Sequence, residues 1–177
     1  MIPGCDNSGS KIEPMTRKSK ATKRPMVPLP KLDAFPGHGI RRLQQAAVAS
    51  FMRDVVSSVV TPVQFAVLYK LAELPNIDQR TLAQAVGIDA STIGGVIDRL
   101  EARGWLVRNL SREDRRVRRV ELTDAGAKLL REITPSVLEV QSRILEPLSN
   151  AQREQFLQLM DVLLAHHEAC YAALTGR

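Results

Sequence analysis

The residues with the clearest chemical potential are arginines, which crowd a short stretch in the second half of the chain. Between positions 99 and 119 the sequence holds eight arginines and three acids, a local net charge of +5. The arginines are Arg99, Arg103, Arg108, Arg112, Arg115, Arg116, Arg118 and Arg119. A guanidinium group can bind a phosphate through two parallel hydrogen bonds or enter a narrow minor groove, whereas a lysine acts as a point charge. A run in which every cation is arginine therefore favours contact with nucleic acid.

Small and hydrogen-bonding residues precede this run at the spacing of a helix. Asp89 is placed to cap that helix, because a carboxylate at such a position accepts from free backbone N–H groups. The buried stripe would be formed by Ile93, Val96, Ile97 and Leu100. The outer face would carry Ser91, Thr92, Gly95, Asp98 and Arg99. Short side chains near a helix N-terminus suit contact with base edges and phosphates, although a surface helix with a few polar residues would have the same pattern.

A helix-turn-helix followed by a β-ribbon would position both groups of residues. A first helix is expected to begin at Asp78 and to end at Gly87, since glycine adopts the left-handed conformation at little cost. After the second helix, residues 105–107 and 117–122 are typical of two strands joined by a tip at 111–116. This order is that of a winged helix-turn-helix, which places one helix in the DNA major groove and a ribbon beside it. The predicted DNA-binding residues are Ser91, Thr92, Gly95, Arg99, Arg112, Arg115 and Arg116.

Residues 81–130 resemble the multiple-antibiotic-resistance regulators, known as the MarR family. Their sequence is TLAQAVGIDASTIGGVIDRLEARGWLVRNLSREDRRVRRVELTDAGAKLL. The pair Asp114-Arg115 falls where that family has its wing-tip Asp-x-Arg-type signature, and pairing of Asp114 with Arg108 or Arg115 would fix the tip. The resemblance covers the chain from about Gly37 to the C-terminus. It implies an obligate homodimer that binds pseudo-palindromic operators in double-stranded DNA, usually as a repressor, and releases them when a small, often aromatic, ligand binds.

Long amphipathic helices are predicted on both sides of the winged unit, so the expected fold is mainly α with a small β-wing. Apolar residues recur every three or four positions within 37–58, 129–148 and 156–174. Capping boxes at 61–64 and 149–152 open two of the helices. Apolar faces of these helices that the chain itself does not cover predict a two-fold homodimer. Its two winged helix-turn-helix units, here called the reading heads, would lie about one DNA turn apart, roughly 34 Å. The predicted division is a basic tail at 1–33, dimerisation helices at 34–60 and 123–177, and a winged helix-turn-helix at 61–122.

The first 33 residues are expected to form a disordered tail, because they hold five of the ten prolines and almost no apolar periodicity. Residues 1–31 carry seven cations and two acids, so they account for +5 of the overall net charge of +6. Two interpretations remain open for this tail. It is either a solubilising leader or misassigned start, or a basic arm that adds salt-dependent attraction to DNA.

The resemblance also implies an effector pocket between the first two helices, the reading head and the partner subunit. In this chain that region holds His38, Arg42, Phe65 and Tyr69. Two aromatic faces and two cations suit a small aromatic carboxylate, with the ring stacked and the acid group bound by arginine or histidine. One branch of the family controls the catabolism of aromatic acids. The alternative is that Phe65 and Tyr69 only pack the core, which would leave an architectural or partner-gated DNA-binding module without a small-molecule ligand.

Other chemistry has little support in the sequence. A Gly-rich phosphate loop, a Ser-His-Asp order and paired carboxylates are all missing, so neither an enzyme nor a cofactor is expected. His166, His167 and Cys170 have a spacing like that of metal ligands, and the family has a zinc-sensing branch, so a metal-sensing regulator is a further alternative. Adjacent histidines point apart on a helix, however, and a core or interface role is expected for this group. Cys5 has no neighbour that would depress its pKa for redox sensing. Without a signal peptide or a run of about 18 apolar residues, we expect a soluble cytoplasmic protein with no membrane contact.

Overall fold

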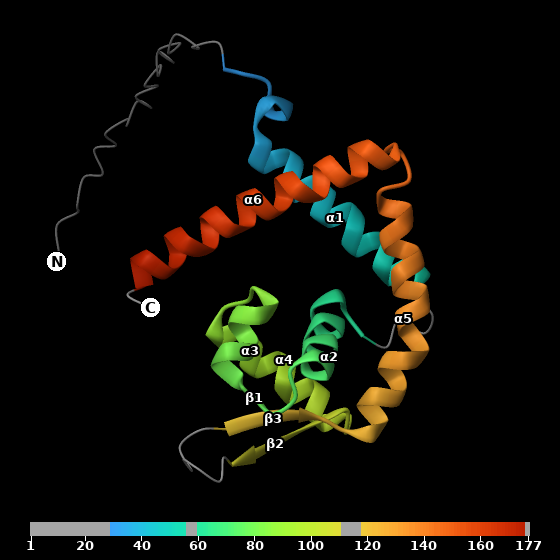
Figure 1. The fold of residues 1–177 in the computed structure, drawn as a ribbon, viewed down its shortest axis with the longest axis vertical. Helices are drawn as coiled ribbons and strands as arrows, with labels where there is room; N and C mark the ends of the chain where they lie inside the picture. The colour runs from blue at the N-terminus through green and yellow to red at the C-terminus, as the bar shows by residue number, and fades with distance from the viewer. Residues whose placement is uncertain (1–28, 56–59, 111–117, 176–177) are drawn as a thin grey trace, which may run out of the picture.

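The computed structural model describes residues 29–55, 60–110 and 118–175, with side chains of the last helix described as far as His167. The elements in chain order (Figure 1) are η1 (Leu32–Ala34), α1 (Pro36–Asp54), α2 (Pro62–Glu73), β1 (Ile77–Asp78), α3 (Gln79–Val86), α4 (Ala90–Ala102), β2 (Leu106–Leu110), β3 (Arg118–Leu122), α5 (Asp124–Ile144) and α6 (Asn150–Thr175). The predicted fold class, mainly α with a small β-wing, is confirmed. Most of the predicted tail, residues 1–28, lies outside the described residues.

Local hydrogen bonds at the helix starts explain why the helices begin where the sequence predicts. Thr61 and Gln64 form the predicted capping box, with Thr61 N–H donating to Gln64 Oε1 at 2.9 Å and Gln64 N–H donating to Thr61 Oγ1 at 3.3 Å. Asp78 caps α3 by accepting from the backbone N–H groups of Arg80 and Thr81. Gly87 then ends α3 at φ +71°, in the left-handed region that glycine tolerates.

The sheet contains one strand more than predicted. Its order is β1-β3-β2 with antiparallel pairing, so β3 is central and β2 is an edge strand. The two predicted strands of the ribbon are confirmed as β2 and β3, but β1 was not predicted; in it Ile77 pairs with Val120 and Asp78 with Arg119. A two-residue strand has no alternation that a sequence pattern could reveal. Strand β1 joins the start of α3 to the wing, because it pairs with β3.

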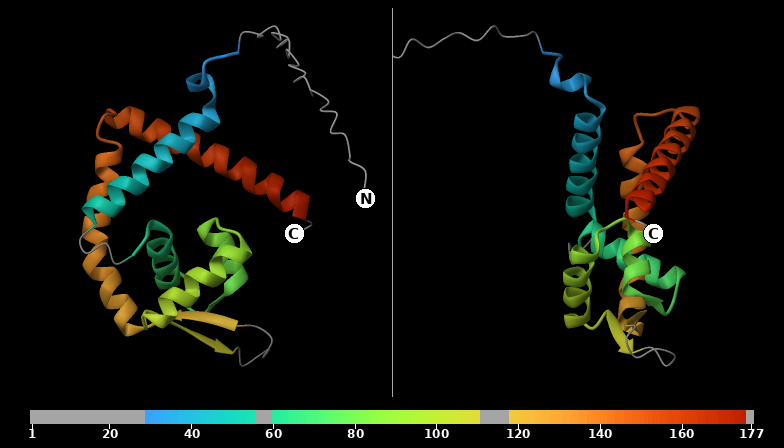
Figure 2. Two further views of the ribbon diagram at one scale, coloured as in Figure 1. Left: turned by 180° about the vertical axis from the view of Figure 1, so that it is seen from behind. Right: turned by 90° about the vertical axis from the view of Figure 1, so that its left-hand side faces the viewer.

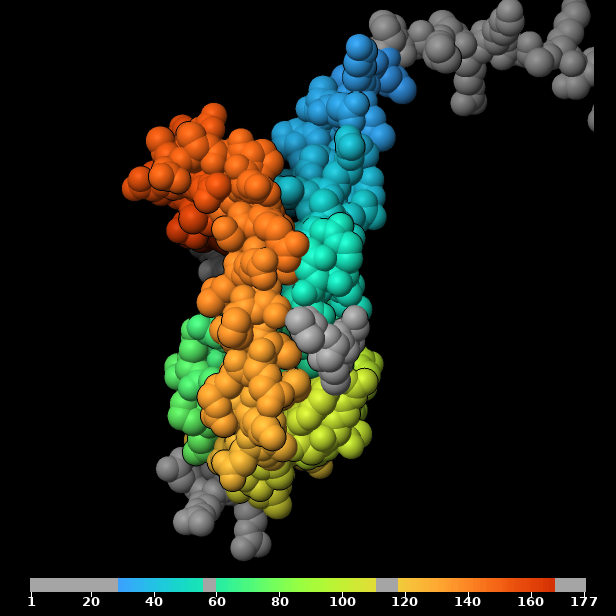
Figure 3. All heavy atoms as spheres, turned by 90° about the vertical axis from the view of Figure 1, so that its right-hand side faces the viewer, coloured from blue at the N-terminus to red at the C-terminus, as the bar shows by residue number. Residues whose placement is uncertain are grey.

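The helix α5 connects the reading head to the rest of the molecule. Thr123 caps it, accepting from Gly126 N–H at 3.1 Å while donating its hydroxyl proton to Gly104 O at 2.7 Å. A Cβ atom on Gly126 would lie 2.0 Å from the Trp105 carbonyl oxygen, so only glycine permits this close approach. Figure 3 shows α5 running from the wing, past the end of α1, toward the start of α6. The centre of the buried core is formed by α2, α3, α4 and the sheet, with Val67, Leu68, Leu71, Leu82, Ile97, Leu100, Leu106 and Val120 each at most 2% exposed.

The outer helices present apolar side chains to solvent in the single chain. Helix α1 ends at Asp54 rather than at the predicted Ser58, and it packs against α5, where Arg143 Nη1 lies 3.3 Å from Asp54 Oδ2. On α1, Ile40 is 63% exposed. Figure 2 shows that α6 begins at the end of α5 that lies away from the wing. None of the described helices is long and apolar enough to cross a membrane.

Candidate nucleic-acid interface

The helix α4 presents the face that the sequence predicted. Its apolar stripe is buried, with Ile93, Val96, Ile97 and Leu100 between 0% and 3% exposed. Ser91, Thr92 and Arg99 are exposed on the outer side, and Gly95 is half-buried. The structure thus brings four of the predicted DNA-binding residues onto one surface, and the core stripe determines which way that surface points.

The N-terminus of α4 is already occupied by a carboxylate. Asp89 accepts from the backbone N–H groups of Ser91 and Thr92 at 3.0 and 2.8 Å, and it also accepts the hydroxyl protons of both side chains. The Ser91 hydroxyl, followed by that of Thr92, holds the pKa of Asp89 far below its ordinary value. This geometry does not support the expected phosphate at the helix N-terminus. Both hydroxyls instead offer only oxygen lone pairs outward, which suit the amino groups of cytosine or adenine.

Arg108 joins the wing to α4. Its Nε donates to Glu101 Oε2 at 2.9 Å, its Nη2 also contacts Glu101, and its Nη1 lies 2.7 Å from Asp98 Oδ1. The backbone N–H of Arg108, on edge strand β2, donates to Glu101 Oε1 at 3.1 Å. The hydrogen bond from Arg108 lowers the pKa of Glu101, and the same bond raises the pKa of Arg108. Among the described residues, the carboxylates that Arg108 contacts are those of Asp98 and Glu101. The predicted pairing of Asp114 with Arg108 or Arg115 stays a prediction, because Asp114 lies outside the described residues.

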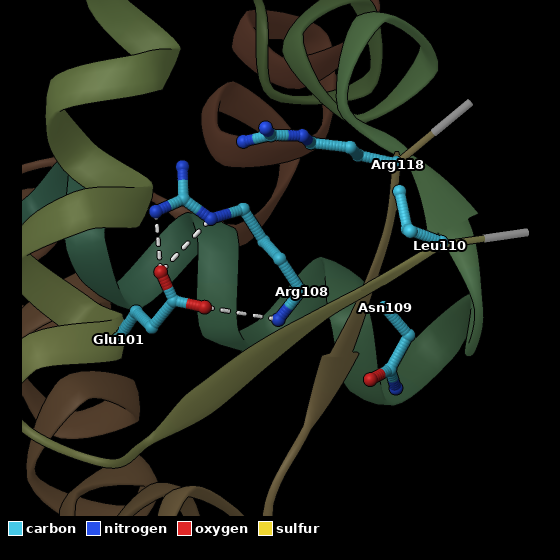
Figure 4. A pocket seen from close by; sticks show the side chains of 5 residues that line it. All are labelled: Glu101, Arg108, Asn109, Leu110 and Arg118. Carbon is cyan, nitrogen blue, oxygen red and sulfur yellow. Dashed lines mark hydrogen bonds and ion pairs between the residues drawn. The ribbon is translucent and has the colours of Figure 1, made fainter. Parts of the chain in front are cut away.

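Figure 4 shows a hollow at the foot of the wing, beside the bond between Arg108 and Glu101. Its lining residues are Glu101, Arg108, Asn109, Leu110 and Arg118. Three of the predicted DNA-binding residues, Arg112, Arg115 and Arg116, lie outside the described residues. Arg118 belongs to the arginine run, but its sequence position does not distinguish it from its neighbours, because only the fold places it across from α4.

The predicted effector residues form two separate groups within one chain. His38 and Arg42 lie near the start of α1, where Asp33 Oδ1 is 3.7 Å from His38 Nε2 and 3.4 Å from Arg42 Nη1. Phe65 and Tyr69 lie on α2 with ring centroids 5.6 Å apart, and Phe65 also packs on Phe51 at 6.0 Å. Phe51 follows Arg42 by nine residues, which is about 14 Å along a helix. A single chain therefore does not bring the cations and the rings together.

The histidines of α6 have no ligand set around them in the part of the chain that the structure describes. His166 and His167 are exposed and their rings meet edge to face at 5.5 Å. Among the described residues, no group of three or more histidine, cysteine or acidic side chains is arranged to hold a metal ion. The side chain of Cys170, like residue Cys5, lies outside the described part.

Comparison with known proteins relates the sequence to one family. Residues 60–117, from before α2 into the wing, match the model of the MarR family. A transcriptional regulatory protein for the hcr operon of Thauera aromatica is 33% identical over 125 residues, which are 70% of this chain and 75% of that protein. The chain belongs to the MarR family. The transcriptional repressor NicR of Pseudomonas putida is 30% identical to this MarR-family protein over 75% of the chain and 84% of its own length.

Solved structures share the fold of this MarR-family protein. PcaV from Streptomyces coelicolor, in complex with its natural ligand, has a TM-score of 0.74 at 33% identity and covers 78% of this chain and 98% of its own. BpsR from Bordetella bronchiseptica, whose DNA binding is regulated by 6-hydroxynicotinic acid, has a TM-score of 0.73 at 30% identity over 77% and 97%. The repressor CouR, bound to a 23-mer DNA duplex, has a TM-score of 0.71 at 28% identity over 78% and 99%. The MarR-family protein described here is accordingly a DNA-binding transcriptional regulator.

Proposed function

We propose that this protein is a homodimeric repressor that leaves a pseudo-palindromic operator when a small aromatic carboxylate binds between the dimer helices and the reading head. The observation that carries the effector part is the aromatic pair on α2. Tyr69 is 43% exposed although its ring lies 5.6 Å from that of Phe65. An exposed ring beside a half-buried one offers a flat apolar surface for a ligand ring.

The cations for the ligand's acid group would come from a second copy of the chain. His38 and Arg42 lie too far along α1 from the aromatic pair to serve it within one chain. A guanidinium binds a carboxylate through two parallel hydrogen bonds, which would orient the stacked ring. The regulation of BpsR by 6-hydroxynicotinic acid, an aromatic carboxylic acid, supports this class of ligand.

The dimer is supported by the apolar surface of α6. Its exposed large apolar side chains are Leu157, Leu159, Met160, Val162, Leu163 and Leu164, each 37–67% exposed. At 100° per residue these positions cover most of the circumference, and the polar side is narrow, formed by Glu154, Gln158 and Asp161. A helix that is apolar on most sides is buried in its working state, here between the outer helices of two copies.

DNA recognition would follow the winged-helix arrangement. We place α4 in the major groove, with Ser91, Thr92, Gly95 and Arg99 against the bases and phosphates. Arg112, Arg115 and Arg116 at the wing tip would enter the adjacent minor groove. The complex of CouR with a 23-mer duplex supports a footprint that accommodates two reading heads.

Regulation would act through the spacing of the two heads. A ligand between α1 of one copy and α2 of the other would bind more tightly at one separation of the heads than at the other. A difference of about 1 to 3 kcal/mol in its binding free energy would weaken DNA binding roughly 5- to 150-fold. The test uses 6-hydroxynicotinic acid and benzoate, with thermal shift for binding and fluorescence anisotropy for release of a duplex from the gene's own upstream region. The double variant Arg42→Ala/Tyr69→Ala should bind DNA normally and lose the response. Arg131→Ala, which removes an exposed arginine of α5 away from both groups of candidate effector residues, is the control and should respond as the wild type does.

A second candidate, a regulator without a small-molecule effector, is favoured by one contact. The carboxylate of Asp33 lies within 3.4 Å of Arg42 and 3.7 Å of His38, where a ligand's acid group would have to bind. If this contact is permanent, no acid raises the melting temperature and DNA release depends on a protein partner. Release of DNA from the double variant at the wild-type ligand concentration would contradict the proposed pocket.

A further inference from the structure

The hollow at the foot of the wing lies between the two elements that a winged helix-turn-helix places in neighbouring DNA grooves. Glu101 borders it from α4, Arg108 and Leu110 from β2, and Arg118 from β3 (Figure 4). Adjacent grooves of a duplex are separated by one phosphate backbone. When α4 enters the major groove and the wing the minor groove, that backbone must therefore cross the space above the hollow.

Arg108 is not available to a phosphate at this place. Nε and Nη2 contact Glu101 and Nη1 contacts Asp98, so each of its guanidinium nitrogens already has a carboxylate partner. Its side chain is only 22% exposed. Breaking these contacts would leave two acids facing the DNA. Arg108 acts as a brace between α4 and β2 rather than as a ligand for DNA.

Arg118 differs from Arg108 in each of these respects. It is exposed, and no hydrogen bond or ion pair joins its side chain to another of the described residues. Figure 4 shows its side chain extending from β3 on the same side of the sheet as that of Arg108, toward the hollow. Its positive charge contributes to lowering the pKa of Glu101. Arg118 is thus a cation at the hollow whose donors are unused in the described part of the chain.

We infer that Arg118 binds a phosphate of the backbone that passes between the two grooves. The charges around the hollow make this arginine decisive. Asp98, Glu101 and Arg108 together carry a net charge of −1, and Arg118 brings the sum to zero. Without Arg118 a phosphate passing this group of side chains would meet two carboxylates and one arginine, and like charges at short range repel. The contact carries no sequence information, because phosphates are the same at every step.

The test measures how affinity depends on salt for the operator duplex and for a scrambled duplex of equal length. Arg118→Gln should reduce the slope of log K against log salt by about one ion per reading head, or about two per dimer. Affinity should fall by the same factor on both duplexes. Arg118→Lys should keep most of the slope. Arg131→Gln removes an exposed arginine of α5 that has no hydrogen bond or ion pair to another described residue, and it should leave the slope unchanged.

A second variant tests the charge balance directly. Asp98→Asn removes one negative charge while the contacts of Arg108 with Glu101 remain. Added to Arg118→Gln, it should recover part of the lost affinity at low salt without restoring the slope. An unchanged salt slope in Arg118→Gln would overturn the phosphate contact. A loss of affinity confined to the operator duplex would also overturn it, because that result would indicate a contact with a base. Wild-type protein that ignores every duplex would instead contradict DNA binding itself.

Discussion

Gly126 gives the sharpest test of how α5 is fixed to the reading head. A Cβ atom there would lie 2.0 Å from Trp105 O and 2.9 Å from Trp105 C and from Leu122 Cδ1. Two of these three atoms belong to backbone, so a rotamer change cannot relieve the overlap. Trp105 O also accepts from Thr123 N–H at 3.1 Å, and moving α5 outward would lengthen that bond.

The expected cost of Gly126→Ala follows from these contacts. Overpacking of a tight site costs about 1 to 3 kcal/mol, and a weakened hydrogen bond adds about 1 kcal/mol. The better helix propensity of alanine offsets at most about 1 kcal/mol. We therefore expect a net loss of about 1 to 3 kcal/mol in the free energy of unfolding.

Urea denaturation at one fixed protein concentration measures this loss, since the stability of a dimer depends on concentration. Gly94→Ala is the matched control, because its Cβ would meet only Gln79 Nε2 at 3.7 Å, an ordinary contact. That variant should gain roughly 0.5 to 1 kcal/mol from helix propensity. Equal stability of Gly126→Ala and the wild type would refute the close approach of α5 to Trp105.

Three further predictions test the cap, the brace and the dimer. Ser91→Ala should raise the pKa of Asp89 toward its ordinary value, as followed by NMR titration. Because the pKa of Asp89 is depressed in the folded state, its stabilising effect is present above the unfolded pKa and is lost as the pH falls through the acid range. If the free energy of unfolding of Ser91→Ala falls with pH as steeply as that of the wild type below about pH 4, this prediction is contradicted. Glu101→Gln should speed amide exchange of Arg108 by about tenfold, and unchanged exchange would show that the brace does not hold the edge strand. Leu163→Asp should convert dimer to monomer in sedimentation velocity, whereas an unchanged dimer would exclude this face of α6 from the interface.

The parts of the fold that the sequence predicted depend on local contacts. Asp78 and Asp89 lie two and three residues from the N–H groups that they cap, so composition and spacing were enough to identify them. Gly87 was predictable for the same reason. Apolar periodicity also identified the core stripe of α4, but it overextended α1, because Val55 is buried although it lies just beyond the helix.

The parts that could not be predicted depend on long-range geometry. The described partners of Arg108 come from a helix distant in sequence, since α4 and β2 pack side by side. Strand β1 exists only because Ile77 meets Val120 across the fold. The candidate effector residues stay a prediction, because His38 and Arg42 lie apart from Phe65 and Tyr69 within one chain, and their proposed assembly needs a second copy that one chain's sequence does not position.

Half-site spacing tests most directly the claim that two reading heads are held at a fixed separation. The measurement compares the affinity of the wild-type protein for its operator with that for an operator lengthened by 5 base pairs between the half-sites. That insertion turns one half-site to the opposite side of the duplex, because a DNA turn is about 10 to 10.5 base pairs. We expect affinity for the lengthened operator to fall to that of a single half-site. Equal affinity for both duplexes would contradict a rigid pair of heads.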